Sequence, residues 1–398
     1  MHIPAQVPAD AASRQQARDP VRLRGDAYIT ITAPFYPDAD PLTPHHRWAD
    51  RVGADLDGTG SLVRQDLPLE QLLRGTLTYE LPRLEELTGF AASPAWRRTL
   101  REALCGAAAG GGSDALFTEP EVIGMYCPDG YGSVSATIRV PGGWDENNRP
   151  ATLRAVGVDG REPLAERLRE HLLPPLQRML RHCGGQTSAT VVLPYFNLTY
   201  AGSTDHPVPG RAVLDDGLRP LIYPDSARPL RSSSPWWDEF LYTGYAYHLL
   251  ASRDPVGNLQ KLSLLLLILN VLYARLARFA GAADEALQHR ERYTDLEWLA
   301  RVERQLRAQY QALVTPTFSF DHHALRVRDA VLRSWDVPKL QNRADNLLSM
   351  LRNAVELQLA ENQARRVRRL NLFVAILAGL TVIPTTEAVV ALFRHFSG

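Results

Sequence analysis

Strand-type and helix-type hydrophobic spacing alternate in the first half of the chain. Residues 27–34 (AYITITAP) alternate β-branched and small side chains and end at a proline, which predicts a β-strand. Residues 121–127 and 132–140 flank a Pro-Asp-Gly turn, which predicts a β-hairpin. Residues 162–182 carry leucines at helical spacing and are followed by two glycines, which predicts a helix and its end. This half is therefore predicted to be α+β, a mixed sheet with helices.

The second half keeps helical spacing almost throughout, and strand signals are absent from it. Helices are predicted at residues 236–252, 259–280, 284–313, 320–335 and 338–369. The last of these carries an approximate one-sided apolar stripe, formed by Leu340, Leu347, Leu351, Val355 and Leu359. The predicted domains are a flexible tail (1–24), the α+β domain (25–234), an all-helical domain (235–337) and a long stalk helix (338–369).

An apolar segment at residues 370–393 follows the stalk helix. As a helix it would extend about 36 Å at 1.5 Å per residue, against a hydrocarbon core of about 30 Å. The segment is therefore predicted to be a transmembrane helix. The alternative is an amphipathic or buried C-terminal helix, which Pro384, Thr385 and Glu387 in its second half favour. A second apolar run at residues 262–273 has only about a dozen residues, so a buried core helix is predicted there.

Four arginines, Arg365, Arg366, Arg368 and Arg369, stand directly before the apolar segment. The positive-inside rule keeps such a cluster on the cytoplasmic side of a membrane. The prediction is a single-pass protein of the cell membrane with a cytoplasmic N-terminal body.

Small and polar residues share one side of the predicted span. Asn371, Ala375 and Gly379 would let helices approach closely, and we expect a homo-oligomer on that basis. Glu387 is expected near the headgroups of the far leaflet, because an ionisable group inside the span is costly. A pore-lining Glu387 is the alternative.

Composition and charge exclude several classes of protein. Hydrophobic residues make up 45% and charged residues 22% of the chain, as in globular proteins. The 44 basic residues balance the 44 acidic ones, so nucleic-acid binding is not expected. Cys105, Cys127 and Cys183 form no CxxC pair and are expected to be reduced, buried thiols. Membrane lipid is the expected partner.

The candidate catalytic and metal motifs are incomplete. Asp55 and Asp57 match the DxDGT box of haloacid-dehalogenase-type phosphatases, but no apolar strand precedes them and both lysines of the chain lie in the helical half. A turn is therefore predicted there, and a hydrolase is the weakest hypothesis. Asp321-His322-His323 has the letters of a metal phosphoesterase motif, but the companion acidic motifs of a two-metal site are not recognisable. The pair His45-His46 lacks convergent ligands. The aromatic run at residues 236–248 is expected to pack between domains. Neither enzymatic activity nor a cofactor or metal is expected.

The order of segments over residues 338–393 resembles the CorA-like cation-transporter superfamily and its single-span relatives. In that superfamily a stalk helix continues into the first span of a pentamer, followed by a Gly-Met-Asn signature and a second span. This chain lacks the signature and the second span. Its Gly124-Met125 is followed by Tyr126 instead of Asn. A fainter likeness is to membrane-tethered components of bacterial conflict (defence) systems.

The resemblance implies a membrane-anchored homo-oligomer in which a cytosolic sensing domain is coupled to the C-terminal span. Such a protein could be an ion-transport relative or a channel-like effector. The resemblance also implies a possible protein partner in a signalling or defence system. The alternative is a non-conducting binding or scaffold protein of a defence system, whose last helix docks on a membrane or a partner.

Overall fold

The structure is a computed structural model of the whole chain, and its contacts divide the chain into two units. The first unit comprises Met1–Arg278 and Gln309–Asn342, and the second comprises Phe279–Ala308 and Arg343–Gly398. The residues that the structure describes are 20–37, 62–67, 87–107, 118–127, 130–145, 164–183, 191–204, 213–214, 239–244, 246–288, 296–314 and 322–396.

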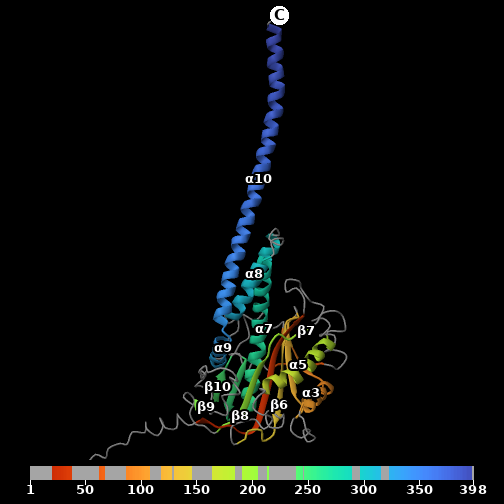
Figure 1. Cartoon of the computed structure of the whole chain (residues 1–398), viewed down its shortest axis with the longest axis vertical. Coiled ribbons are helices and arrows are strands. Elements are labelled where there is room, and N and C mark those ends of the chain that lie inside the picture. Colours follow the sequence, from red (N-terminus) through yellow and green to blue (C-terminus); the bar gives the residue numbers. More distant parts are fainter. Residues whose placement is uncertain are drawn as a thin grey trace, which may run out of the picture. The chain divides into compact units, whose positions relative to one another are not determined.

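A mixed sheet forms the centre of the first unit (Figure 1). Its longest strand, β2 (Arg24–Pro37), lies between two antiparallel neighbours, β6 (Gly132–Val140) and β8 (Asn197–Ser203). Beyond β6 the sheet continues antiparallel through β5 (Glu121–Tyr126), β4 (Thr88–Ala92) and β3 (Leu62–Arg64). Beyond β8 it continues through β11 (Tyr247–Ser252), which is parallel to β8, and the antiparallel β10 (Glu239–Thr243). The predicted α+β class and the predicted hairpin are confirmed.

Three short strands lie at the margins of this arrangement. The strand β7 (Val191–Val192) pairs with the end of β2. A separate parallel pair joins β1 (Pro20–Val21) to β9 (Val213–Leu214). The predicted tail at 1–24 therefore ends in strand residues, and positions 1–19 lie outside the described part of the chain.

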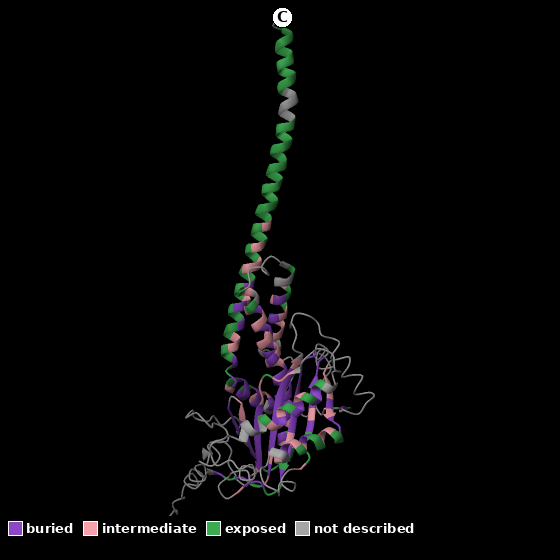
Figure 2. Ribbon diagram, turned by 45° about the vertical axis from the view of Figure 1, so that its right-hand side comes forward, coloured by how far each residue is buried: buried purple, intermediate pink, exposed green. Residues whose placement is uncertain are grey.

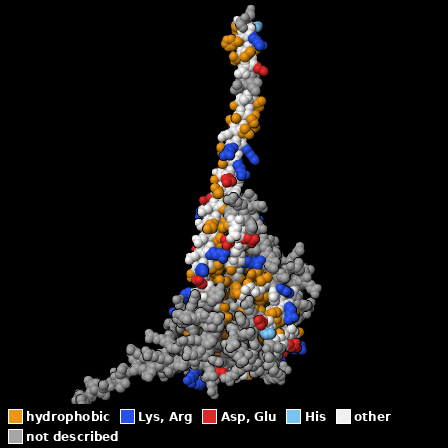
Figure 3. Space-filling model, in the orientation of Figure 1, with side chains coloured by type: hydrophobic (Ala, Val, Ile, Leu, Met, Phe, Trp, Pro, Cys, Tyr) orange, Lys and Arg blue, Asp and Glu red, His pale blue; other side chains and the backbone are white. Residues whose placement is uncertain are grey.

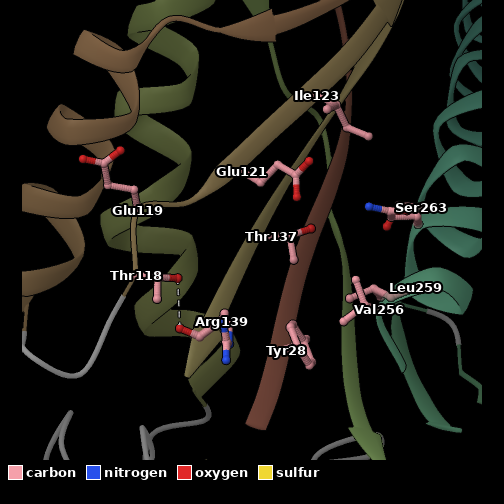
Figure 4. Close-up of a pocket in the computed structure, with 11 residues that line it drawn as sticks. Tyr28, Thr118, Glu119, Glu121, Ile123, Thr137, Arg139, Val256, Leu259 and Ser263 are labelled. Carbon is pink, nitrogen blue, oxygen red and sulfur yellow. Dashed lines mark hydrogen bonds between the residues drawn. The ribbon is translucent and has the colours of Figure 1, made fainter. Parts of the chain in front are cut away.

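Helices cover both faces of the sheet. One face packs against α3 (Pro94–Ala107) and α5 (Leu164–Cys183), where alternate β2 residues such as Ile29 and Ile31 join a core with Leu100 and Leu176. The other face lies against the first part of α7 (Pro255–Gln288), and Figure 4 shows the sheet between the two helical layers. Because strand side chains alternate, the odd and even positions of β2 belong to different layers.

The sheet face beneath α7 is polar although most of it is buried. Pairing across the strands aligns a row of side chains at one level: Thr243, His248, Thr199, Thr30 and Thr137. The hydroxyl groups of Thr30 and Thr137 lie 2.9 Å apart and form a hydrogen bond. One level further, Asn197 Nδ2 donates to Asn270 Oδ1 of α7 at 2.9 Å.

The helix α7 is the core helix of the first unit. It is capped by Asp254, whose Oδ1 accepts the Gly257 N–H at 3.1 Å, and Pro255 occupies the first helical position. Residues 262–271 are all buried, which confirms the prediction of a buried core helix in this run. Among the described residues one helix, Pro255–Glu285, is long and apolar enough to cross a membrane, and its most apolar 18-residue window has a mean hydropathy of 1.7. Its most apolar window is 72% buried inside the protein.

Two helix predictions are wrong. Residues 236–252 were predicted as a helix, but β10 and β11 form an antiparallel hairpin there, in which the Gly244 N–H donates to the Tyr247 carbonyl at 2.7 Å. Aromatic residues also suit a pleated, half-buried surface, and Gly244 supplies the turn. The sheet therefore extends to Ser252 instead of ending near residue 234. The helix predicted at 284–313 is divided, because α7 ends at Gln288 and α8 (Leu296–Val314) begins after it.

The remaining helices are α9 (His322–Ser334) and α10 (Val337–Phe396). Asp336 between them has φ of 54°, a left-handed conformation that ends α9 before α10 begins. Within the first unit, Arg328 of α9 is buried and donates from Nη2 to the Leu313 carbonyl of α8 at 2.8 Å. The guanidinium thereby satisfies a carbonyl at the end of α8 that has no partner within its own helix.

The second unit is helical. It contains the end of α7, most of α8 and nearly all of α10. Arg343 Nη2 of α10 lies 2.6 Å from Asp284 Oδ2 of α7. The side chains buried in this unit include Ala283, Val302, Leu306, Ala344, Leu347 and Leu351.

Candidate functional site

The apolar stripe predicted on the stalk helix has a buried beginning and an exposed end. Leu347 and Leu351 are buried, Val355 is half-buried and Leu359 is 48% exposed. The stalk segment of α10 therefore leaves its packing partners before the apolar segment begins.

The apolar segment itself is exposed. From Gln363 onward, every residue whose side chain the structure describes is exposed, and Figure 2 shows these parts of α10 in green on either side of a short grey stretch. Leu372 is 63% exposed and Phe393 is 73% exposed. The other large apolar side chains in this state are Leu370, Phe373, Val374, Ile376, Leu377, Leu380, Val389, Val390, Leu392 and Phe396. Exposure of this extent marks a surface that a membrane or another protein covers.

The arginine cluster precedes this surface on the same helix. Figure 3 shows the blue Arg side chains directly before the orange apolar ones. Arg365, Arg366, Arg368 and Arg369 are all exposed. Arg365 Nη2 lies 3.7 Å from Glu361 Oε2 one turn earlier, an exposed pair that contributes little to stability. The cluster is therefore available to anionic groups.

The predicted positions inside the span lie on the same continuous helix. Asn371, Ala375, Gly379 and Glu387 are exposed, and nothing lies within 4 Å of a Cβ placed on Gly379. The helical backbone continues through Pro384 and Thr385, whose side chains lie outside the described part of the structure. The homo-oligomer expected from the small residues stays a prediction, as does the role of Glu387.

Most of the other candidate positions lie outside the described residues. These are Asp55, Asp57, His45, His46, Trp236, Trp237 and Asp321, together with the side chains of His322, His323, Cys105 and Cys183. Cys127 is buried and is not in a disulfide, as predicted. Tyr242 and His248 are buried in the sheet instead of packing between domains on a helix. Within the described part of the chain, no group of three or more His, Cys, Asp or Glu side chains could hold a metal ion.

The sequence pattern does not predict the pocket that lies between α7 and the polar face of the sheet. Its volume is about 270 Å³. Figure 4 shows Tyr28 of β2, Glu121 of β5, Thr137 of β6 and Ser263 of α7 around it. Its apolar wall is formed by Ile123, Val256 and Leu259. These residues come from distant parts of the sequence, so only strand order and register bring them together.

One end of the pocket contains an ion pair. Arg139 approaches Asp26 Oδ2 through Nη2 at 2.6 Å and through Nε at 2.8 Å. Asp26 Oδ1 also accepts the Gly142 N–H at 2.9 Å. The Gly142 hydrogen bond, followed by the contact with Arg139, holds the pKa of Asp26 below its usual value despite the opposing effect of burial. The charge of Arg139 is therefore already balanced within the protein.

Comparison with protein-family models, curated proteins and solved structures finds no significant match to this chain. Its function is therefore argued from its own residues: an exposed apolar helix preceded by arginines, and a pocket in the α+β unit.

Proposed function

We propose that the chain is a single-pass membrane-anchored protein, in which the C-terminal part of α10 crosses the bilayer. The observation that carries this proposal is the uninterrupted exposure of apolar side chains from Leu370 to Leu380 and from Val389 to Phe393. Full burial of a Leu, Ile, Val or Phe side chain is worth about 1.5–3 kcal/mol. A segment with this many such side chains gains far more from hydrocarbon than from water.

A helix is also the form in which a chain can enter hydrocarbon, because all its backbone polar groups are paired within the segment. The described helix α10 has no interruption between the arginine cluster and Phe396. Side chains of the arginines fit the headgroup level, where they contact anionic lipids. By the positive-inside rule this places the arginine end, and the α+β unit before it, in the cytoplasm.

The helix α7 is the competing candidate for a span, since Pro255–Glu285 is apolar enough to cross a membrane. That helix already has a partner, because 72% of its most apolar window is buried inside the protein. Moving α7 into a bilayer would break the Asn197–Asn270 hydrogen bond and expose the core side chains that cover the sheet. Moving the C-terminal segment of α10 into a bilayer would not require the loss of such contacts.

The finer proposals concern what the anchored protein does. The order of elements, a mixed sheet first and a long helix last, supports the relation to CorA-like proteins. Ion conduction is the proposal that liposome ion-flux measurements would test. In the alternative proposal α10 docks on a partner protein and the chain is a non-conducting binding or scaffold protein.

Alkaline-carbonate fractionation of the full-length chain tests the anchor. We expect the full chain to stay in the membrane pellet and a chain ending at Arg369 to become soluble. In a second variant, Leu377→Arg and Leu380→Arg place two charges in the apolar segment, each costing about 2.5–3.5 kcal/mol near the centre of a span. We expect this variant to leave the pellet.

The matched control is the pair Met350→Arg and Leu357→Arg, two exposed apolar positions on α10 before the arginine cluster. This control should fractionate like the unmodified chain, because neither position lies in the proposed span. Release of the unmodified chain by carbonate would sink the anchor and favour docking on a protein.

A further inference from the structure

We propose that the pocket between α7 and the sheet binds a small organic cation, an alkylammonium or guanidinium compound, with its charged group on Glu121. This site is separate from the proposed membrane anchor and lies wholly in the first unit.

The charges around the pocket are unequal. Arg139, its basic residue, is paired with Asp26 through two contacts. Glu121 lines the pocket on strand β5 and is exposed, and its carboxylate has no ion pair or hydrogen bond with any described side chain. Figure 4 shows its carboxylate on the same side of the sheet as Thr137 and Ser263. A cation is therefore the ligand that completes the site, since a carboxylate and an ammonium or guanidinium group form a strong hydrogen-bonded pair.

A hydroxyl group of α7 also lines the pocket. Ser263 is 3% exposed, and its hydroxyl can donate a hydrogen bond to a ligand in the cavity or accept one from it. Tyr28 adds a half-buried ring at the same pocket, and the face of such a ring attracts cations.

The volume and the donor set indicate an organic ligand. About 270 Å³ is near the lower limit of ligand pockets, which suits a compound of metabolite size. Divalent cations such as Ca²⁺ and Mg²⁺ prefer several oxygen ligands, and the described residues offer no group of three potential side-chain ligands. The apolar wall of Ile123, Val256 and Leu259 would instead contact a short hydrocarbon body.

Isothermal titration calorimetry of the full-length protein in nanodiscs of neutral lipid tests this proposal with three probes of similar shape. These are n-butylammonium chloride, n-butanol and sodium butyrate. We expect saturable binding of butylammonium, with an affinity at least about tenfold higher than that of the neutral or anionic probe, because only the cation pairs with Glu121. Stronger or equal binding of butanol or butyrate, or no saturable binding of butylammonium, would overturn the proposal.

The variant Glu121→Gln keeps the shape of the side chain and removes its charge, and we expect a loss of butylammonium affinity of about tenfold. Glu102→Gln is the matched control, because Glu102 is an exposed residue of α3, which packs on the opposite face of the sheet and does not line the pocket. Its affinity should be unchanged. Ser263→Leu places a larger side chain in the cavity and should abolish binding of butylammonium. Equal affinities of the Glu121→Gln and unmodified proteins would refute the site, whatever the fractionation experiment shows about the anchor.

Discussion

Single buried residues carry the clearest electrostatic consequence in this protein. His248 of β11 is completely buried, and neither ring nitrogen has a hydrogen-bond partner among the described residues. Burial lowers its pKa from 6.5 to about 3. Its neighbours in the strand register are Thr199 and Thr243, which bring no charge to it. His248 is therefore neutral in the folded protein under ordinary conditions.

This burial predicts a loss of stability in acid. Between pH 6.5 and pH 3 the unfolded chain binds a proton at His248 and the folded chain does not, so the free energy of unfolding falls as the pH falls through this range. The slope approaches about 1.4 kcal/mol per pH unit. Thermal unfolding of the full chain and of His248→Leu in mild detergent, at pH 7.5 and pH 5, measures it.

The difference between the two proteins isolates the contribution of His248, because the other titrating groups are common to both. We expect the unmodified protein to lose more stability than His248→Leu between the two pH values. Identical losses in both proteins would contradict a buried neutral His248.

Residue-level chemistry was also the hardest part to predict from the sequence. The aromatic spacing around His248 fits a helix as well as a strand, so the sequence pattern alone assigned it to the wrong element. Glu121 and Ser263 carry no motif, and their proximity follows from the register of β5 and the placement of α7. The arginine cluster and the apolar segment needed no tertiary information, because four neighbouring charges and a long apolar run are local features.

At the scale of elements, α7 combines an apolar surface with one specific polar contact to the sheet. Asn270 lies within a run of leucines and isoleucine, and its side-chain oxygen accepts from Asn197 of β8. Both residues are buried. The hydrogen bond fixes one rotational position of α7 that leucines alone would not select, because buried polar pairs specify register.

We expect removal of this hydrogen bond to lower the free energy of unfolding measurably. Asn270→Leu leaves the Asn197 amide buried without its partner, which costs about 1–3 kcal/mol. The double variant Asn197→Leu and Asn270→Leu should recover part of that loss, since neither partner is then left unpaired. Denaturant unfolding in detergent measures the free energy of unfolding of both variants. An unchanged value for Asn270→Leu would show that the Asn197–Asn270 hydrogen bond does not stabilise the fold.

The elements that could be predicted are those whose spacing is set by local neighbours. The hairpin of β5 and β6 has its turn between two alternating strands, and the stripe of α10 repeats along one helix. The hairpin of β10 and β11 was missed because its aromatic residues also occur at helical intervals. The position of β2 at the centre of the sheet depends on non-local pairing with β6 and β8, which spacing does not encode.

At the scale of the whole molecule, the apolar part of α10 adds exposed surface and no buried side chain to the described structure. No described side chain from Gln363 onward is buried. We therefore expect a chain ending at Arg369 to keep the unfolding temperature of the α+β unit within about 2 °C of the full-length protein. Near-ultraviolet circular dichroism during heating measures it, because the aromatic residues of the sheet core lie in the first unit. A fall of about 5 °C or more would mean that the segment stabilises the fold, since that shift corresponds to about 1 kcal/mol or more.

The apolarity of α7 has a consequence for synthesis of the chain on the ribosome. The most apolar window of Pro255–Glu285 has a mean hydropathy of 1.7, so this helix would be a substrate for the cell's insertion machinery if no folded sheet were present to cover it. All described strands of the sheet precede it along the chain, so the surface that covers α7 is synthesised before α7 itself. The order of elements therefore lets a folded sheet shield this helix during translation.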